Sequence, residues 1–287
     1  MKSNRVNKNT TFLAVILVLS IISACTNKND LKLSKTETSN IGKFHNQGLD
    51  FINSQMFNSS KFKVTHDYIT YGKRIIPFEE NTVPSKELIN LAYDFVDENT
   101  TYPQIYDIEI QKDELVTELD FIREDISSNA LQLIWSNNTS SACEIIDIPL
   151  TEKQAVSDLE KVFSDLGNQI YLSPYQQYDY IKKKIESLQS KYVLNESELF
   201  SGLLEIASSS NDYWYLSNQT TGNLPGIPIN NPQTALVQID CIGYIVGWAV
   251  AVNDDYRNGQ LTPDRQWGRI RAGLIGAIGA SSLGLIH

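Results

Sequence analysis

Small residues near the C-terminus constrain the fold of this chain more than any other feature of the sequence. They repeat every fourth residue in two apolar segments, 235–252 and 269–286, and on a helix such a repeat forms one smooth ridge. The first ridge consists of Gly243, Gly247 and Ala251, and the second of Gly276, Ala280 and Gly284. Two helices with such ridges can bring their backbones unusually close together.

These glycines favour two helices that pack against each other. Glycine costs a helix roughly 0.8–1.0 kcal/mol relative to alanine, so several glycines need a compensating contact. The polar segment Asn253–Gly268 suits a turn between antiparallel partners, and the sequence therefore predicts a close-packed helical hairpin over residues 235–286. Asp240 and Arg271 leave the apolar stretches shorter than the roughly 20 residues that span a bilayer. We expect a hairpin buried in a soluble domain, and a hairpin that enters a membrane is the alternative.

Apolar residues recur at helical spacing through most of the remaining chain. One-sided stripes begin at Ile41, Leu88, Leu115, Ala155, Tyr175 and Leu199. Only Phe62 to Ile76 and Cys143 to Ile148 have the character of strands or extended loops, and residues 217–233, rich in Gly, Pro and Asn, are expected to form a long loop. The sequence predicts a mainly α fold, an amphipathic helical domain with minor β or extended segments and the C-terminal hairpin.

The first 25 residues have the organisation of an export signal. Basic residues precede the apolar run 12–22, which is too short to cross a bilayer. The run ends in Ile22-Ser23-Ala24-Cys25, an aliphatic residue, two small residues and a cysteine, and this motif resembles the lipobox of bacterial lipoproteins. In that family the thiol takes a diacylglycerol and the signal peptidase cuts just before the cysteine. The alternative is a plain secretory signal or an N-terminal anchor in which the cysteine is incidental.

The chain is expected to have three parts. The resemblance implies that residues 1–24 are the signal peptide and that Cys25 becomes the lipidated, palmitate-carrying first residue of the mature chain. Residues 25–40 are polar and lack a core pattern, as expected of a tether. Residues 41–287 then form a single, mainly helical domain. The implied location is the bacterial cell envelope, at the outer membrane of a Gram-negative cell and otherwise on the outer face of the cell membrane.

The charge of the mature chain excludes some partners. The predicted signal peptide holds three of the 24 basic residues and none of the 34 acidic ones, which leaves 21 basic and 34 acidic residues, a net charge of −13. Such an acidic body suits neither nucleic acid nor anionic lipid headgroups, and its simplest meaning is solubility. We expect no nucleic-acid partner, and attachment to a membrane through the N-terminal lipid.

Two cysteines remain after lipidation, Cys143 and Cys241. An exported compartment permits a disulfide bridge between them. Each is also surrounded by apolar neighbours and suits the role of a small buried residue. Spacing alone does not decide between a bridge and two buried thiols.

The sequence contains no familiar catalytic or metal-binding motif. Its histidines are His45, His66 and His287, and neither a His-Glu-x-x-His motif nor paired-cysteine spacing occurs. Phosphate-binding glycine loops and a Gly-x-Ser-x-Gly elbow are missing too. We therefore expect no bound metal and no cofactor.

His45 is the one histidine that suggests chemistry. It aligns with Ile41 and Leu49 on a predicted helix, and Asp50 lies on a neighbouring face. In one interpretation His45 is a core histidine whose ring nitrogens are satisfied by hydrogen bonds, which we favour. In the other, His45 transfers protons at a cleft and Asp50 is a further candidate catalytic residue.

These observations favour a binding protein over an enzyme. We expect a non-catalytic binding or structural component of the envelope, with another envelope protein, a peptide or a glycan as its partner. An exported hydrolase with a site near His45 is the first alternative. A membrane-active protein that acts through its helical hairpin is the second.

Overall fold

The computed structural model describes ten stretches of the chain: residues 40–58, 62–65, 68–71, 74–77, 85–100, 112–117, 140–167, 172–192, 199–221 and 232–284. All of them belong to one unit, Leu33–His287. The predicted lipobox and nearly all of the predicted tether lie outside the described residues, as do residues 222–231 of the predicted loop.

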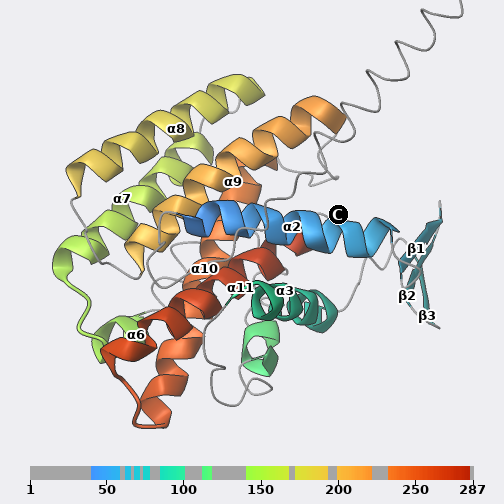
Figure 1. Cartoon of the computed structure of the whole chain (residues 1–287). Coiled ribbons are helices and arrows are strands. Elements are labelled where there is room, and N and C mark those ends of the chain that lie inside the picture. The colour runs from blue at the N-terminus through green and yellow to red at the C-terminus, as the bar shows by residue number, and fades with distance from the viewer. Residues whose placement is uncertain are drawn as a thin grey trace, which may run out of the picture. The chain divides into compact units, whose positions relative to one another are not determined.

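Helices make up most of the described residues, so the predicted mainly α fold is confirmed (Figure 1). Residues 112–117 are also helical. The labelled helices are α2 (Ile41–Asn58), α3 (Ser85–Asn99), α6 (Ser140–Ile145), α7 (Leu150–Gly167), α8 (Pro174–Lys191), α9 (Phe200–Thr221), α10 (Pro232–Arg257) and α11 (Gln266–Gly284), with the short 3-10 helix η4 (Pro263–Arg265) before α11.

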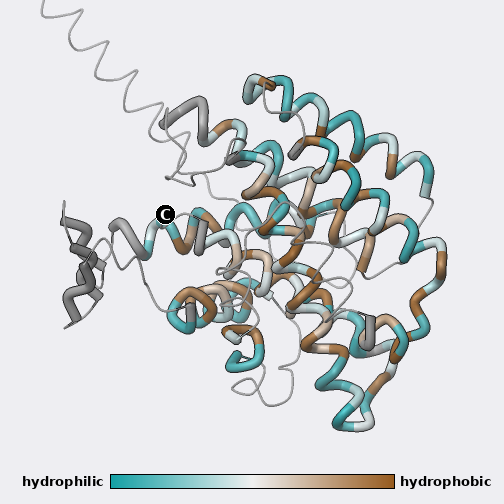
Figure 2. The backbone as a smooth tube through the Cα atoms, turned by 180° about the vertical axis from the view of Figure 1, so that it is seen from behind, coloured by the Kyte–Doolittle hydropathy of each residue, from teal (hydrophilic) through white to brown (hydrophobic). Residues whose placement is uncertain are grey.

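The helix α8 shows how local sequence determines an element. Ser173 caps its first turn by accepting from the backbone N–H of Gln176, whose side chain in turn accepts from the backbone N–H of Ser173, and Pro174 preorganises the first helical residue. Ile181 and Ile185 are buried on one face, while the residues between them are exposed. Figure 2 shows the resulting alternation of hydrophilic and hydrophobic residues along the outer helices.

A small antiparallel sheet follows α2. It has the order β1-β2-β3, with β1 at Phe62–Thr65, β2 at Tyr68–Tyr71 and β3 at Arg74–Pro77. In its register Val64 of β1 pairs with Ile69 of β2, and Ile69 pairs with Ile76 of β3. The strand character predicted for Phe62 to Ile76 is therefore confirmed, and β1 contacts α2.

The C-terminal hairpin lies at the centre of the helical part. The helices α10 and α11 pack along each other, α9 contacts α10, and α2 and α3 contact α11 (Figure 1). A methyl group added at Gly243 would overlap with the backbone oxygen of Gly276, and one at Gly247 with that of Ala272. The backbones therefore approach as closely as the small residues predict, and the antiparallel, close-packed hairpin is confirmed. Ala251 is buried on α10, and Gly284 is the last residue of α11.

One described helix is long and apolar enough to cross a membrane by length and composition. It is the stretch Gln233–Arg257 of α10, and its most apolar window has a mean hydropathy of 1.8. That window is 100% buried inside the protein. In this structure the segment is therefore surrounded by other parts of the protein rather than exposed as a membrane-spanning helix would be.

Three local predictions need correction. Cys143 to Ile148 is not a strand, because α6 runs to Ile145 and a turn follows it. The helices α9 and α10 extend into both ends of the loop predicted for residues 217–233. The predicted turn Asn253–Gly268 is shorter, since α10 continues to Arg257 and α11 begins at Gln266.

Ion pairs explain why α10 continues past its apolar part. Asp255 accepts from the guanidinium groups of Arg265 and Arg269, with N–O distances of 2.9 Å for each ion pair. The side chains of Asp255 and Arg269 are both buried. Charged residues that looked like loop residues in the sequence therefore join the end of α10 to η4 and α11.

A methyl group at Gly276 tests the close packing of the hairpin. The Gly276→Ala variant should lose about 1–3 kcal/mol of unfolding free energy, because the methyl group meets the backbone of Gly243, which has no rotamer to change. Urea unfolding followed by circular dichroism measures this loss. Gly259→Asn is the control, since Gly259 has a φ of 64° and open space around it, and asparagine tolerates that conformation. A loss at Gly276 no larger than that at Gly259 would contradict the close contact.

Candidate functional site

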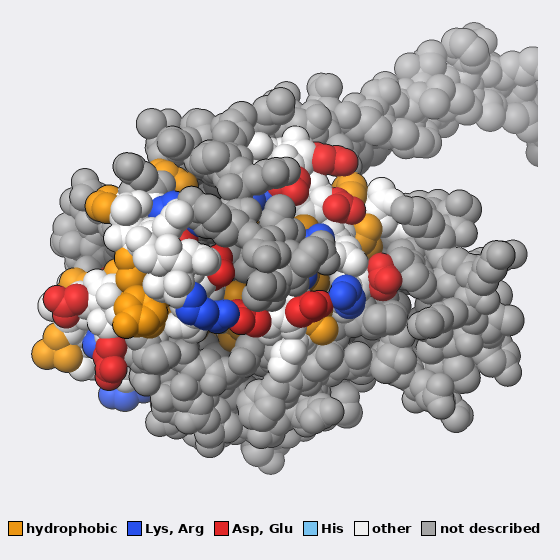
Figure 3. All heavy atoms as spheres, turned by 90° about the horizontal axis from the view of Figure 1, so that it is seen from below, with side chains coloured by type: hydrophobic (Ala, Val, Ile, Leu, Met, Phe, Trp, Pro, Cys, Tyr) orange, Lys and Arg blue, Asp and Glu red, His pale blue; other side chains and the backbone are white. Residues whose placement is uncertain are grey.

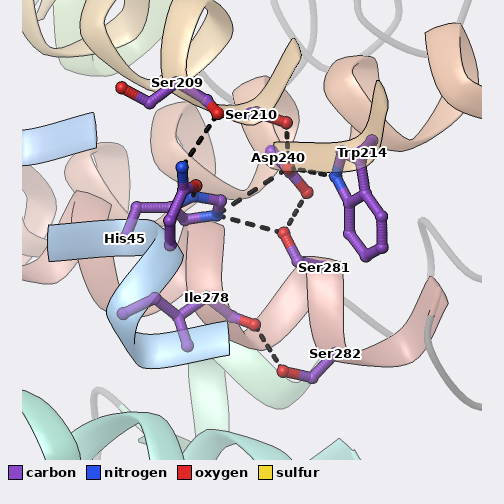
Figure 4. A network of polar contacts seen from close by, with 9 residues as sticks. His45, Ser209, Ser210, Trp214, Asp240, Ile278, Ser281 and Ser282 are labelled. Carbon is purple, nitrogen blue, oxygen red and sulfur yellow. Dashed lines mark hydrogen bonds and ion pairs between the residues drawn. The ribbon is translucent and has the colours of Figure 1, made fainter. Parts of the chain in front are cut away.

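A buried polar network joins four helices at the centre of the protein (Figure 4). We call it the His45–Asp240 network. Its members are at most 1% exposed: His45 of α2, Ser210 and Trp214 of α9, Asp240 of α10, and Ser281 of α11. Each residue lies on a helix face that otherwise carries apolar side chains, so their polar groups depend on one another for hydrogen bonds.

Asp240 is the acceptor at the centre of this network. Its Oδ2 accepts from the hydroxyl of Ser210 and, at 2.9 Å, from the indole Nε1 of Trp214, while its Oδ1 accepts from the hydroxyl of Ser281. Burial raises the pKa of Asp240, and the neighbouring His45 and the three donors act in the opposite direction. The carboxyl group is therefore held by donors on both oxygens although it is fully buried.

Both ring nitrogens of His45 have partners. Nδ1 lies 3.0 Å from Oδ1 of Asn46, and Nε2 lies 3.1 Å from the hydroxyl oxygen of Ser281. The amide nitrogen of Asn46 donates to the backbone oxygen of Ser209 at 2.8 Å, so its oxygen faces the ring and Nδ1 of His45 carries a proton. Nε2 is also 3.8 Å from Oδ2 of Asp240. The favoured prediction, a core histidine with satisfied nitrogens, therefore describes His45 in this structure.

The order of these groups differs from that of a serine hydrolase. In a hydrolase the imidazole lies between the hydroxyl and the carboxylate, and it removes the proton of the hydroxyl. Here the hydroxyl of Ser281 lies between His45 and Asp240 and donates to the carboxylate. All three side chains are fully enclosed, so the arrangement supplies hydrogen bonds and charge compensation between helices rather than an activated nucleophile.

The second predicted catalytic candidate, Asp50, is not part of this network. Its Oδ1 accepts from the hydroxyl of Tyr213 at 3.1 Å in an exposed contact. Burial and the nearby Asp50 raise the pKa of Tyr213, so this hydroxyl is a hydrogen-bond donor at neutral pH. The carboxylate that faces His45 comes from Asp240, far away in the sequence. One feature of the sequence pointed to it, because a lone acid within a long apolar helix needs a partner.

Cys143 and Cys241 are free and buried in the structure. Burial raises the pKa of Cys143 to about 12. Burial also raises the pKa of Cys241, and the carboxylate of Asp240 adds to that rise. Both therefore stay protonated at neutral pH and behave as small apolar residues, the second of the two alternatives left open by the sequence.

A second buried network lies between α8, α9 and α10. Asn211 donates to the backbone oxygen of Tyr178 at 3.0 Å and accepts from Gln233 at 3.2 Å. Thr234 donates to Gln177 at 3.2 Å. These uncharged contacts fix the first turn of α10 against α8 and α9, and they carry no titratable group.

In the part of the chain that the structure describes, no group of three or more His, Cys, Asp or Glu side chains could hold a metal ion. The chain was compared with protein families, curated proteins and solved structures, and none of them matches it. Among the described residues, the His45–Asp240 network is the buried group that contains a candidate catalytic residue, so the functional role is argued from it.

Removal of His45 tests the pairing of His45 with Asp240. The His45→Leu variant should lose about 3–5 kcal/mol of unfolding free energy, because it removes one partner of a buried pair and leaves Asp240 without the imidazole beside it. In the double variant His45→Leu with Asp240→Asn, no charge is buried alone. Its loss should be smaller than the sum of the two single losses by about 0.5–3 kcal/mol, as measured by urea unfolding of all four proteins. Additive losses would show that the two groups are not coupled.

Proposed function

We propose that this chain is a bacterial lipoprotein, anchored through lipid on Cys25, whose helical body serves as a non-catalytic binding or structural component of the cell envelope. The location follows from the lipobox Ile22-Ser23-Ala24-Cys25, preceded by a basic and then an apolar segment. Two or more acyl chains anchor a protein stably, because each buried CH2 contributes roughly 0.8 kcal/mol. The anchor thus accounts for membrane attachment without a spanning helix.

The observation that carries the non-catalytic role is the enclosure of His45. A proton-transfer group must come within hydrogen-bond reach of its substrate. His45 is 0% exposed, and its two nitrogens are already bonded to Asn46 and Ser281. The hydrolase alternative would need the packed helices around His45 to separate before a substrate could reach it.

The surface supports a protein, peptide or glycan as the partner. Figure 3 shows acidic and basic side chains interspersed on one face of the molecule, with no broad basic area among the described residues of that face. The net charge of −13 for the chain after residue 24 disfavours nucleic acid and anionic lipid. We therefore propose that the lipid holds the protein at the membrane while its body faces another envelope component.

The anchor can be tested in cells with one substitution and one matched control. Cys25→Ser should abolish labelling with radioactive palmitate and move the protein from the membrane fraction to the soluble fraction, because no thiol remains for the diacylglycerol. Cys143→Ser should label and fractionate like the parent, since Cys143 is buried in the folded body. If Cys25→Ser labels, migrates and fractionates like the parent, the proposed anchor and envelope location are wrong.

A membrane-active hairpin is the second candidate, and the length and hydropathy of α10 are the observation that favours it. The two candidates differ in what they do to a bilayer. With a hairpin that stays buried, the purified protein should release no dye from liposomes. Dye release that Gly247→Leu abolishes would support the membrane-active candidate over the one proposed here.

A further inference from the structure

The hydrogen bonds of the His45–Asp240 network require a fixed number of protons. Ser281 has one hydroxyl proton, and it donates that proton to Asp240. Nε2 of His45 faces the same hydroxyl oxygen, so it must donate to it, and Nδ1 donates to Asn46. His45 is then an imidazolium and Asp240 a carboxylate. The pair carries no net charge.

The same number of protons allows one other arrangement. If Asp240 is protonated on Oδ1 and donates to Ser281, then Ser281 donates to Nε2 of a neutral His45. Relative to the first arrangement, one proton has moved from Nε2 of His45 to Ser281 and another from Ser281 to Asp240. Every donor still has an acceptor. The network thus holds one shared proton, and both arrangements are neutral and fully hydrogen-bonded.

If the shared proton is lost, no arrangement of the remaining protons satisfies all the hydrogen-bonding groups. A carboxylate and a neutral imidazole would then both need the single proton of Ser281, so one buried acceptor would be left without a donor. The network would also carry an uncompensated negative charge in a fully buried region. Loss of this proton therefore opposes the packing of the helices that carry the three groups.

The helix α2 packs closely against α9 and α11. Gly42 of α2 lies so close to the backbone oxygen of Glu205 and the side chain of Ser209 that a methyl group would overlap with them. Gly48 of α2 lies against the side chain of Ile278 of α11. Contacts of this kind do not stretch gradually, so α2 is either docked or displaced.

Several titratable and polar groups lie around this pair. Glu205 of α9 is half-buried beside Gly42 of α2, where burial raises its pKa and Lys43 of α2 opposes that rise. The described groups that act on Asp240 are His45 of α2, Ser210 and Trp214 of α9, and Ser281 of α11. Tyr213 of α9 and Cys241 of α10 also interact with Asp240, and their raised pKa values keep both neutral.

The acidic groups on the other elements packed around the pair have partners of their own. Asp50 of α2 bonds to Tyr213, and Asp97 of α3, which packs on α11, is paired with Arg271. On α7 the carboxylate of Glu152 accepts from the backbone N–H of Phe200 at 2.9 Å.

We propose that His45, Ser281 and Asp240 form a pH-sensitive switch, which holds α2 on the hairpin while the three groups share one proton and releases α2 when that proton is lost. In a displaced or unfolded chain the last proton of such a pair leaves near the ordinary histidine value of about 6.5. The docked state keeps the proton to higher pH, since its loss leaves a buried acceptor without a donor and a buried charge without compensation. Between the ordinary Asp and His values of about 3.9 and 6.5 both states hold one proton and the stabilisation is fully present, and it is lost as the pH rises above ~6.5. An envelope protein would meet such changes of external pH directly.

Hydrogen exchange of the purified full-length protein tests the switch. The opening constant of the α2 amides, corrected for intrinsic exchange, should rise with pH above about 7, by up to about tenfold per pH unit, since one proton is released on opening. The amides of α8, which does not contribute to the network, should keep their protection. Purified protein is used, so the outcome does not depend on the proposed lipid anchor or location.

Two variants separate the switch from a general loss of stability. In Asp240→Asn the amide donates to Ser281 and its oxygen accepts from Ser210 and Trp214, so the hydrogen bonds remain while the shared proton is gone, and the α2 opening constant should not change with pH. Ser282→Ala is the matched control, because the hydroxyl of Ser282 donates only to the backbone of Ile278 at 2.6 Å, and it should keep the parental pH dependence. A flat response of the parent, the same slope in Asp240→Asn, or equal loss of protection in α2 and α8 would each overturn the proposal.

Discussion

The contact between the backbones of α10 and α11 is the constraint on which the rest of the structure depends. Gly243 and Gly276 let the two helices approach until one backbone touches the other, with Gly247 against Ala272 further along. A methyl group at these points would separate the axes. The same approach brings Ser281 of α11 within hydrogen-bond reach of Asp240 of α10. The glycines therefore decide the apolar packing and, through it, the geometry of the buried polar groups.

The buried charges give the packing its specificity. The close glycine contacts already limit where α2 can lie, and the buried polar groups add the directional hydrogen bonds that apolar contacts lack. Asp240 accepts only where Ser210, Trp214 and Ser281 all point at it, and His45 completes the set from α2. An unpaired member would cost several kcal/mol, roughly 3–5 when one partner of a buried pair is removed. The network thus selects one arrangement of four helices among many that would bury the same area.

The proposed location and the proposed role rest on different kinds of observation. The proposed location depends on a short linear motif, the lipobox-like Ile22-Ser23-Ala24-Cys25. The proposed non-catalytic role depends on the enclosure of His45, which is produced by contacts between residues far apart in the sequence. An enclosed His45 and an acidic chain are compatible with the proposed binding or structural role at a membrane. The proposed pH-sensitive network would let such a body respond to its surroundings.

The sequence by itself determined the helices and the hairpin, because both follow from local spacing: apolar residues at i, i+3 and i+4, and glycines every fourth residue. It also identified His45 as a core residue. Only the tertiary structure decided that Asp240, rather than Asp50, faces His45, that α6 replaces an expected strand, and that Asp255 extends α10 into the predicted turn. Local periodicity does not indicate which residues distant in the sequence become partners, since tertiary packing decides which of the many acids lies beside His45.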